Sequence, residues 1–529
     1  MDILYSISLI TMVFIGFRSV TNLIKLGSNL SWLKKENTNF NNSKNKTERN
    51  VPKFLIFLPM LREQRVIKET LNYFSNLDYP KDSYKIIVIT TEKENFQKLS
   101  NQHRLYDLAN DLSLNRPLTI IKEKHLGLFS SDWLELLHAK YSDIDVAEVA
   151  EKLKTDYQNY PTTLDIAKEY SQIINLKFDT DLIKIIHYPE TTGLIAHQIN
   201  YTTQKLSESD EFSGYYCAIY NADSRPNPNS LKYVADQMQK FKEINGFEAN
   251  IVQQSSIFTL NYNTFPKNII GYFLRTSALL QTKWTLIHEL DRFRTQSSFV
   301  LRPIKNIFDT IRYSKISHCV MHGLFLKLSF LRKNKIPTDV VSEDLLYGFE
   351  QCCKGEPILP IPLLENSESP ETFTQLHNQK RFWFWAYIDY WKYRNRVISN
   401  GLFRSKMEVN ILTLKAYFDG LIWICTSILI GFPLFYSLLT RNITIFIFWC
   451  LVYCIYWIIP TLIIYTKLPE LETYSSKMIT KISFADFLLV TLFGIPVLLS
   501  HSLGPIQCTF DFISNCFTKK LIVKNKTER

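Results

Sequence analysis

Short apolar runs that alternate with amphipathic segments predict a layered α/β domain near the start of the chain. Phe54–Pro59 is continuously apolar, as is typical of a parallel strand buried on both faces. Arg62–Leu77 repeats apolar residues at helical spacing, which predicts an amphipathic helix, and Lys85–Thr90 is a second apolar strand. A strand, a helix and a strand within about 40 residues form a βαβ unit, so we expect a parallel, doubly wound sheet.

The strand pattern resumes further along the chain. Leu182–Ile186, Tyr215–Tyr220 and Asn250–Ser255 are short apolar runs that predict strands. Ser230–Phe241 predicts a helix between the last two strands, with Asn229 as its N-cap. These elements extend the same α/β domain.

Residues 100–185 have a different character. Asp145–Tyr157 and Thr163–Leu176 read as amphipathic helices with charged outer faces. We therefore expect a helical insertion within the α/β domain. Its role is open between a solvated elaboration and a lid or partner-docking element.

Three apolar blocks near the C-terminus predict membrane segments. Gly420–Thr440 and Asn442–Thr466 contain no charged residue, and each exceeds the roughly 20 residues that cross a bilayer. Only Arg441 separates them, which predicts a tight hairpin. The third block, Phe487–Phe510, is interrupted by Pro496 and other helix-breaking or polar residues, so it is either a kinked span or a re-entrant segment.

The N-terminus predicts a membrane anchor. Ile3–Phe17 is apolar and meets Arg18, which we expect to snorkel or to face protein, with the anchor ending at about Leu26. A cleaved signal peptide is the competing interpretation, but the start lacks a basic residue and a small-residue cleavage site. Lys34 and Lys35 then place the following domain in the cytoplasm, at the inner or plasma membrane. With that orientation, a re-entrant third block returns the basic tail to the same side.

Composition and charge narrow the class of protein. Asn37–Asn50 is rich in Asn and Lys and almost free of apolar residues, so we expect a mobile linker. The net charge of +11 suits a protein against an anionic leaflet better than a nucleic-acid partner. The nine cysteines are scattered without metal-ligand spacing, and in a cytoplasmic domain they stay reduced. The aromatic, basic stretch 378–400 predicts an interfacial helix.

The strand at Tyr215–Tyr220 ends in residues that can carry chemistry. Asn221 and Asp223 follow it at once, and Pro226 prevents the strand from continuing. A carboxylate at the tip of a buried strand faces the crevice where α/β sheets bind nucleotides and metals. The alternative for Asp223 is an acid that only closes a turn.

Two further motifs follow in order. Ser342-Glu343-Asp344 lies downstream of His322-Gly323, and Gln379-Lys-Arg-Phe-Trp383 precedes the apolar blocks. The order of these motifs and of the membrane segments resembles the membrane-bound family 2 glycosyltransferases, the group of the cellulose and hyaluronan synthases. The resemblance spans roughly residues 52–400 outside the insertion. It implies a GT-A-type nucleotide-sugar-binding domain between N-terminal and C-terminal transmembrane helices.

The resemblance also implies roles for the acids. In the family an Asp-x-Asp motif binds the donor and its metal, here Mg²⁺ or Mn²⁺; Asp223 matches the second Asp, and Asn221 replaces the first. Asp344 matches the general base of the family. Two adjacent carboxylates, Glu343 and Asp344, beside a buried substrate would raise one pKa, as a base near neutrality needs.

The remaining motif implies acceptor and diphosphate contacts. Gln379 and Trp383 keep the family spacing, and His322 belongs to the same region, whereas Arg381 lies one position early. One position turns a helical side chain by about 100°, so the diphosphate role of Arg381 is less secure than the sugar-stacking role of Trp383. An interfacial aromatic belt is the alternative, more for the neighbouring Trp385 and Trp391 than for Trp383.

The donor side matches the family least. Pro59 and Glu63 correspond to the stretch after the first strand that lies beside the nucleotide. Glu92 stands near the position where the family usually has a base-contacting Asp, and a solvated turn glutamate is an equal alternative. These departures leave the donor base open.

We therefore expect an integral-membrane, inverting, metal-dependent glycosyltransferase that takes a nucleotide-diphosphate sugar and a polysaccharide or lipid-linked acceptor. The alternative is a catalytically inactive scaffold that holds protein partners in an envelope polysaccharide assembly complex. The expected domains are an anchor (1–33), a linker (34–50), the glycosyltransferase domain (51–375), an interfacial region (376–412), a transmembrane or re-entrant region (413–513) and a basic tail (514–529).

Overall fold

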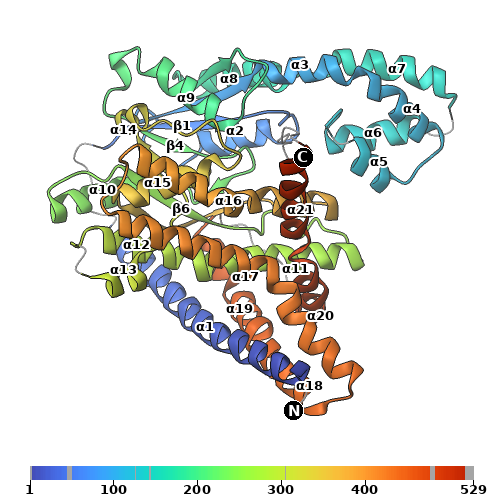
Figure 1. Ribbon diagram of the computed structural model, residues 1–529. Helices are drawn as coiled ribbons and strands as arrows, with labels where there is room; N and C mark the ends of the chain where they lie inside the picture. The colour runs from blue at the N-terminus through green and yellow to red at the C-terminus, as the bar shows by residue number, and fades with distance from the viewer. Residues whose placement is uncertain are drawn as a thin grey trace. The chain divides into compact units, whose positions relative to one another are not determined.

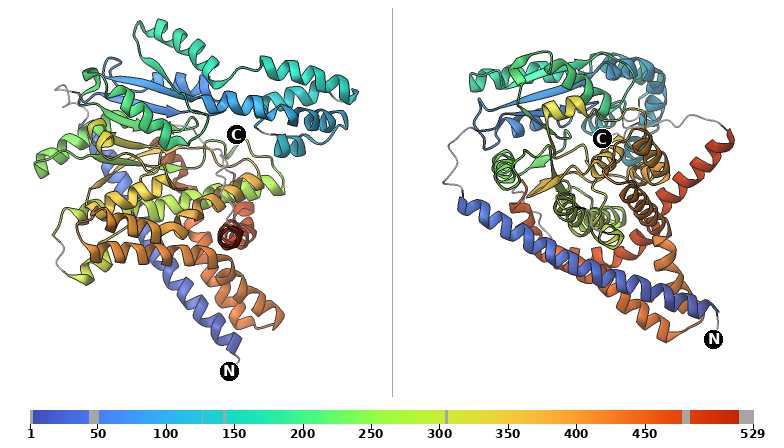
Figure 2. Two further views of the ribbon diagram at one scale, coloured as in Figure 1. Left: turned by 45° about the horizontal axis from the view of Figure 1, so that its top comes forward. Right: turned by 60° about the vertical axis from the view of Figure 1, so that its left-hand side comes forward.

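The computed structural model describes residues 3–43, 51–125, 127–141, 144–303, 306–476 and 483–518. The chain forms two compact units. Figures 1 and 2 show the helices and strands of both units. The sheet unit contains residues 51–224 and 324–339, and the helical unit contains the described residues of 3–43, 225–323 and 340–518.

The sheet unit is built on five strands in the order β3-β2-β1-β4-β7, of which β7 alone is antiparallel to its neighbour. Every residue of β1 is buried, because helices cover both faces of a parallel sheet. The elements are β1 (Phe54–Pro59), α2 (Ile67–Ser75), β2 (Tyr84–Thr91), α3 (Glu92–Ser100), β3 (Ile183–Tyr188), α9 (Ile195–Leu206), β4 (Tyr216–Ile219), β7 (Leu324–Lys327) and α14 (Leu328–Lys333).

The insertion between β2 and β3 is helical, as the sequence predicts. It contains α4 (Arg104–Ser113), α5 (Leu118–His125), α6 (Ser131–Tyr141), α7 (Val146–Asn159) and α8 (Thr163–Phe178). Helices α4 to α7 enclose an apolar core of their own, which includes Leu108, Phe129 and Leu153. Helix α8 instead packs on α2. The insertion is therefore a folded subdomain rather than a set of loose elaborations.

The helical unit combines long helices with three strands in the order β6-β8-β5. Helix α16 packs against α17 and α21, and α11 packs against α20. Its elements are α1 (Ile3–Ser43), β5 (Arg225–Pro226), α10 (Ser230–Asn245), β6 (Ile251–Ile257), α11 (Ile269–Trp284), α12 (Leu290–Val300), α13 (Ile307–Tyr313), α15 (Glu343–Lys354), β8 (Ile358–Asn366), α16 (Phe373–Ser399), α17 (Lys406–Leu439), α18 (Ile443–Tyr453), α19 (Ile459–Thr473), α20 (Phe484–Ser500) and α21 (Leu503–Thr518).

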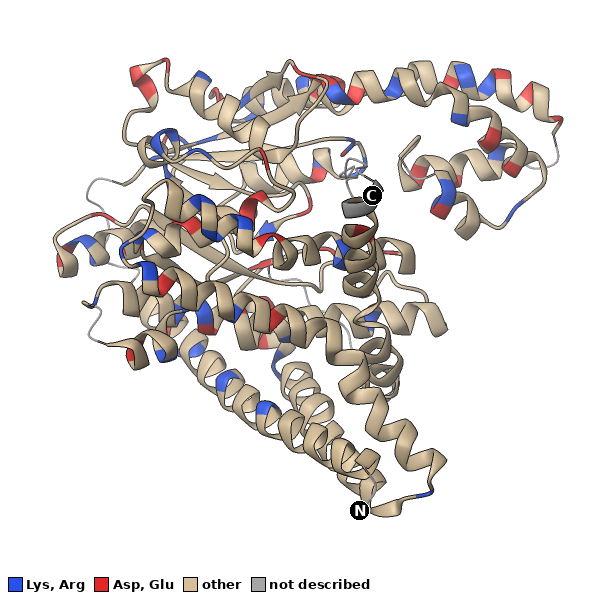
Figure 3. Cartoon of the chain, viewed as in Figure 1, with Lys and Arg blue, Asp and Glu red and all other residues tan. Residues whose placement is uncertain are grey.

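Four helical segments of this unit are long and apolar enough to cross a membrane: Ile3–Asn42, Lys406–Leu439, Ile443–Thr473 and Phe484–Asn515. Figure 3 shows long stretches of α17, α18 and α19 without charged residues. Helix α1 runs along α17 and α18 (Figure 1). The predicted class, an α/β fold with a helical insertion and apolar helices at both ends, is confirmed.

The predicted hairpin is also present, because α17 ends at Leu439 and α18 begins at Ile443 around Arg441, whose φ is 53°. The third apolar block is broken between α20 and α21, at residues 501–502. Whether this block spans or re-enters the membrane stays a prediction, as does the side on which each loop lies.

Some predicted boundaries are wrong. The linker expected from Asn37 does not begin there, because α1 continues to Ser43 and the Asn37 side chain donates to the Pro362 carbonyl, 2.8 Å away, within a buried contact. The helix predicted from Arg62 begins only at Ile67. Residues 44–50 and 519–529, with part of the linker and most of the basic tail, lie outside the described residues.

Two details around β4 also differ from expectation. Asn229 occupies the N-cap position of α10 but makes no capping hydrogen bond with its side chain. Arg225–Pro226 forms a two-residue edge strand that pairs antiparallel with β8, a place that tolerates proline because an edge strand need not donate on its open side.

Candidate functional site

The carboxyl edge of the sheet unit gathers the predicted donor residues. Strands β1 and β4 run parallel with Phe57 opposite Ile219, so Pro59 and Asn221 reach the same edge two residues later. The chain adds β2 and β3 on one side of β1 and β4 on the other. This is a topological switch point, and open α/β sheets bind ligands in the crevice beyond such an edge.

A tight turn holds Asp223 at this edge. The Asn221 amide donates to Ser224 Oγ at 3.0 Å, and the Ser224 amide donates to the Asn221 carbonyl at 3.1 Å. The Thr70 hydroxyl of α2 donates to the Ala222 carbonyl. Asp223 is 2% exposed. A buried carboxylate at a switch point is costly in an apolar interior and suited to a cation or a hydrogen-bonding ligand.

The oxygen ligands offered by Asp223 and Asn221 suit a cation that keeps water and phosphate oxygens as its other ligands. No group of three or more His, Cys, Asp or Glu side chains placed to hold a metal occurs within the described ranges. Mg²⁺ commonly binds through one or two carboxylates together with substrate phosphates, rather than in an all-protein cage. Asp223, with Asn221 beside it, therefore fits the predicted Mg²⁺ or Mn²⁺ in that limited sense.

Glu63 lies in the loop after β1, and Glu94 holds that loop in place. Glu63 is 6% exposed, and its amide donates to Thr163 Oγ1 at 3.0 Å. The Glu94 carboxylate accepts from the Arg62 amide at 3.1 Å, from the Gln64 side chain at 2.8 Å and from the Thr163 amide at 2.8 Å. Arg62 itself has a φ of 56°, which explains why the helix starts later. No local pattern marks Glu94, because its partners lie 32 and 69 residues away along the chain.

Glu92 begins α3 at the same edge of the sheet. Its carboxylate lies 3.1 Å from His187 Nε2, and it accepts from the Asn95 side chain at 3.0 Å. The hydrogen bonds from Asn95 and then from His187 lower the pKa of Glu92. Glu92 is thus a partly exposed acid tied to the end of β3. Its contact with a nucleotide base stays a prediction.

In the helical unit, Glu343 and Asp344 form the first turn of α15. The partial positive charge at a helix N-terminus stabilises ionised carboxylates there, the form that a base needs. Gly348, one turn later, packs against the Ser317–Cys319 segment so closely that a Cβ would lie 2.5 Å from the Cys319 nitrogen. This contact fixes the position of the turn that carries Asp344.

His322 belongs to a polar cluster that the sequence did not reveal in full. Its Nδ1 lies 3.0 Å from Ser256 Oγ and 3.4 Å from a Glu365 carboxylate oxygen. Glu365 is fully buried at the end of β8 and accepts from Ser367 Oγ at 2.8 Å. Gly323, which follows His322 and has a φ of 61°, lies close against β6, where an added Cβ would lie 2.8 Å from Gln254 Cβ. The sequence analysis did not predict a role for Glu365, because the residues around it match no motif.

The residues of the predicted Gln…Trp motif lie on helix α16 and have different surroundings. Gln379 accepts from the Gln281 side chain of α11 at 2.7 Å, and Trp383 is half-buried. Arg381 instead forms an ion pair with Asp511 of α21 at 2.6 Å. The register shift seen in the sequence therefore has a structural counterpart, since Arg381 pairs with α21 of the third apolar block.

Two buried lysines near this motif were missed by the sequence analysis. Lys380 is 5% exposed, and burial lowers its pKa to about 8. Lys283 of α11 is 7% exposed, donates to the Tyr456 carbonyl at 3.0 Å, and has a pKa lowered to about 7 by burial. Neither forms an ion pair with an acid among the described residues.

The comparisons with known proteins give only remote likenesses. No family model and no curated protein matches the chain. The structure is similar to the mannosyltransferase PcManGT from Pyrobaculum calidifontis in complex with GDP-Man and Mn²⁺, at 11% identity over 92% of this chain and 99% of that chain, with a TM-score of 0.36. It is also similar to S. aureus TarS 1–349, at 10% identity over 86% and 92%, with a TM-score of 0.32.

The structure is likewise similar to S. aureus TarS 1–349 in complex with UDP-GlcNAc, at 11% identity over 86% of this chain and 92% of that chain, with a TM-score of 0.33. At such TM-scores these likenesses assign no function to the chain.

Proposed function

We propose that the protein is an integral-membrane, inverting glycosyltransferase of the family 2 type. It transfers a sugar from a nucleotide-diphosphate sugar to a hydroxyl of a polysaccharide or lipid-linked acceptor. The observation that carries the proposal is the buried carboxylate of Asp223 at the topological switch point, on the edge that also holds Pro59, Glu63 and Glu92. The four apolar helices support a membrane location.

In this proposal Asp223 and Asn221 hold Mg²⁺ or Mn²⁺ together with the donor. The ion, when bound, neutralises charge on the leaving diphosphate. Glu63 and Glu92 lie on the donor side, with Pro59 at the strand end. The Asp344 carboxylate takes the proton from the acceptor hydroxyl, whose oxygen forms a bond to the anomeric carbon. The bond from that carbon to the diphosphate breaks, and the nucleoside diphosphate leaves with the electron pair, so the configuration inverts.

The acceptor side consists of His322, Gln379 and Trp383 in the proposal. Trp383 offers a half-exposed aromatic face on which a sugar ring can stack. Arg381 is the residue whose inherited role fits least, because contact with a diphosphate requires its ion pair with Asp511 to open.

A release assay on the detergent-solubilised full-length chain tests the proposal. UDP-, GDP- and dTDP-sugars are offered with Mg²⁺ or Mn²⁺, a lipid extract is added as acceptor, and the free nucleotide is measured. We expect release from one donor, with a loss of about 10²- to 10⁴-fold in Asp344→Asn, since general bases contribute roughly that factor. Asp223→Asn should lose release and metal dependence together.

The matched control is Asp107→Asn, which removes an exposed carboxylate of the insertion and should leave release unchanged. Full release in Asp344→Asn would refute the role of that base. Absence of release from every donor by folded protein would refute the enzyme and favour the second candidate.

That second candidate is a catalytically inactive scaffold of an envelope polysaccharide assembly complex. The Arg381–Asp511 ion pair and the neutral Asn221 favour it, because both remove charge from the expected donor site. The insertion, with its own core, would then be the surface for protein partners. A scaffold predicts that partners are still recruited by Asp223→Asn, whereas the enzyme predicts that this variant is inert in transfer.

A further inference from the structure

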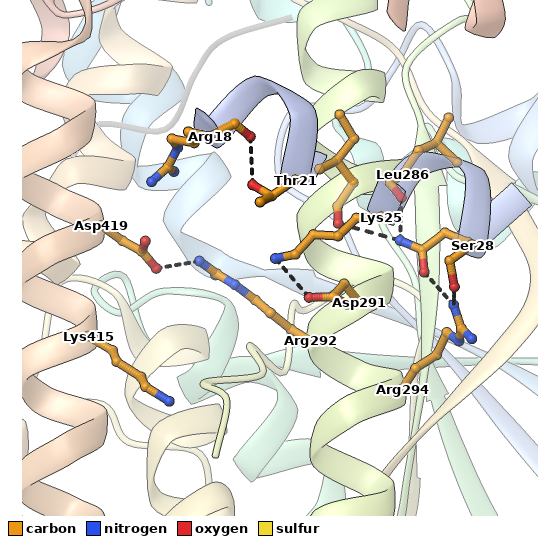
Figure 4. A network of polar contacts seen from close by, with 12 residues as sticks. Arg18, Thr21, Lys25, Ser28, Leu286, Asp291, Arg292, Arg294, Lys415 and Asp419 are labelled. Atoms are coloured by element: carbon orange, nitrogen blue, oxygen red, sulfur yellow. Dashed lines mark hydrogen bonds and ion pairs between the residues drawn. The ribbon is translucent and has the colours of Figure 1, made fainter. Parts of the chain in front are cut away.

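Helices α1, α12 and α17 of the helical unit bring together more positive charge than they neutralise. Figure 4 shows the side chains that meet there. Lys25 pairs with Asp291 at 3.1 Å, and Arg292 pairs with Asp419 at 2.7 Å. These two acids are therefore already engaged by the two cations.

Three more cations lie beside these pairs. Among the described residues, the guanidinium of Arg18 and the ammonium of Lys315 make no hydrogen bond and no ion pair. Lys415 donates only to the backbone carbonyl of Ser314. Glu408, the next acid on α17, is engaged by Arg404 at 2.7 Å. The cluster of Arg18, Lys25, Arg292, Lys315 and Lys415, here called the cation cluster, thus carries uncompensated positive charge.

Independent features indicate that this charge is concentrated. Burial, and after it the charge of Lys25, lowers the pKa of Lys315. His288 lies on the neighbouring π-helical turn Thr285–Glu289. Its pKa is well below the usual range, first because it is buried and then because the positive charges of Arg292, Arg18 and Lys25 lie nearby. Uncompensated charge in or near the membrane region is costly, so its retention points to an anionic partner.

The surroundings of the cation cluster are apolar. On α1, Phe17 and Ile24 flank Arg18 and Lys25 and are 73% and 67% exposed. On α17, Leu414 and Phe418 flank Lys415 and are 68% and 52% exposed. The short helix α13, just before Lys315, exposes Ile307, Phe308 and Ile311. An anion that sits here is therefore bordered by surfaces that suit acyl chains.

Space for a polar group adjoins the cluster. A cavity of about 480 Å³ is lined by Ser28 and Trp32 of α1, by Asp291 and Arg294 of α12, and by Arg302. Arg294 donates to the Asn29 side chain at 2.6 Å (Figure 4), so one wall of the cavity is fixed. Basic pockets between membrane helices are known as places where anionic lipid headgroups bind.

We infer that the cation cluster binds the phosphate of an anionic lipid headgroup, with the acyl chains along the exposed apolar faces of α1, α13 and α17. The phosphate oxygens accept hydrogen bonds from Arg18, Lys315 and Lys415, whose charges the protein leaves uncompensated. A free phosphate offers the same headgroup chemistry but no acyl chains. The cation cluster contains none of the residues assigned to sugar transfer, and its test needs no transfer activity.

The test measures lipid binding to the full-length protein in a neutral detergent by native mass spectrometry. The probes are phosphatidylglycerol, the uncharged diacylglycerol of the same chain length, and inorganic phosphate. We expect bound phosphatidylglycerol in the wild type and about 30-fold weaker binding in the double variant Arg18→Gln/Lys315→Gln, from about 1 kcal/mol per cation. Diacylglycerol should not bind specifically, and millimolar phosphate should not displace the lipid.

The control variant Lys154→Gln/Lys168→Gln removes two exposed lysines of the insertion, with the same change of charge. It should bind the lipid as the wild type does. Equal weakening in the control would overturn the site, as would unchanged binding in the double variant. Displacement by inorganic phosphate would assign the cluster to a free anion and overturn the lipid.

Thermal unfolding keeps the test independent of folding failure. Because Arg18 and Lys315 have no protein partner among the described residues, the double variant without lipid should unfold at the same or a higher temperature than the wild type. The rise in unfolding temperature that phosphatidylglycerol gives the wild type should be lost. A double variant that unfolds at a lower temperature without lipid would show that these cations serve the protein's own packing and would overturn the inference.

Discussion

Gly348 offers a way to move the proposed base without touching it. It stands one turn after Asp344 in α15, against the backbone of residues 317–319. In Gly348→Ala the new Cβ would lie 2.5 Å from the Cys319 nitrogen and 2.5 Å from the Ser317 oxygen, whereas ordinary contact begins at 3.4 Å. Both obstacles are backbone atoms, so the helix and the segment must separate by roughly 0.9 Å.

Two opposing effects set the magnitude. Overpacking of a tight contact costs about 1–3 kcal/mol, while Ala in place of Gly within a helix gains about 1 kcal/mol. We expect a net loss of about 0–2 kcal/mol in the free energy of unfolding. A displacement of a catalytic group by about 1 Å can cost 10²-fold in rate, so kcat should fall by about 10- to 100-fold while the protein stays folded.

The assay combines thermal unfolding with the release of nucleotide at saturating donor. The matched control is Gly27→Ala in α1, where a Cβ would meet nothing within 4 Å. That variant should gain about 1 kcal/mol from helix propensity and keep its activity. A Gly348→Ala protein with wild-type unfolding temperature and wild-type kcat would refute the reasoning, because it would mean that α15 relaxes without moving its first turn.

Two further predictions concern single buried charges. Glu94→Gln should lower the free energy of unfolding by about 1–3 kcal/mol, because the NH₂ group of the new amide would lie against N–H groups that now donate hydrogen bonds to the carboxylate. An unchanged urea midpoint would contradict this. Burial lowers the pKa of Lys380 from its ordinary value of 10.5 to about 8 in the folded protein, so the unfolded state binds more protons between these pH values and stability rises with pH across that window. Below pH 8 the folded protein bears the full cost of burying the charged ammonium of Lys380. Lys380→Met should therefore be more stable than the wild type at pH 7 by on the order of 1–3 kcal/mol, and this difference should vanish near pH 10.5. A constant difference in stability, measured by urea unfolding from pH 7 to 10.5, would contradict the prediction.

The local pattern of the chain was enough to predict its main elements. Phe54–Pro59 and Tyr84–Thr91 are strands because their apolar, β-branched and aromatic residues suit a sheet covered on both faces. The hairpin around Arg441 follows from two uncharged runs that each need a full membrane span. The helical insertion follows from periodicity alone. These features depend on neighbours within a few turns, which a sequence displays directly.

The predicted donor edge was accessible to sequence reasoning for the same reason. Asp223 ends a strand whose stop is marked by nearby prolines, so its place at the sheet edge could be predicted. The actual contacts were less accessible. Glu94, which fixes the loop after β1, gathers partners from α8 and from residues 62–64, and no short-range pattern links these segments.

Local patterns in the chain therefore predict the succession of strands, helices and apolar segments, together with the acids at element ends. The tertiary structure alone decided that Arg381 pairs with Asp511, that Glu365 is buried against His322, and that α1 continues to Ser43. It also decided that the cation cluster forms at all. The physical reason is that charge pairing and burial depend on which distant segments pack together, whereas strand and helix periodicity depend on the residues next along the chain.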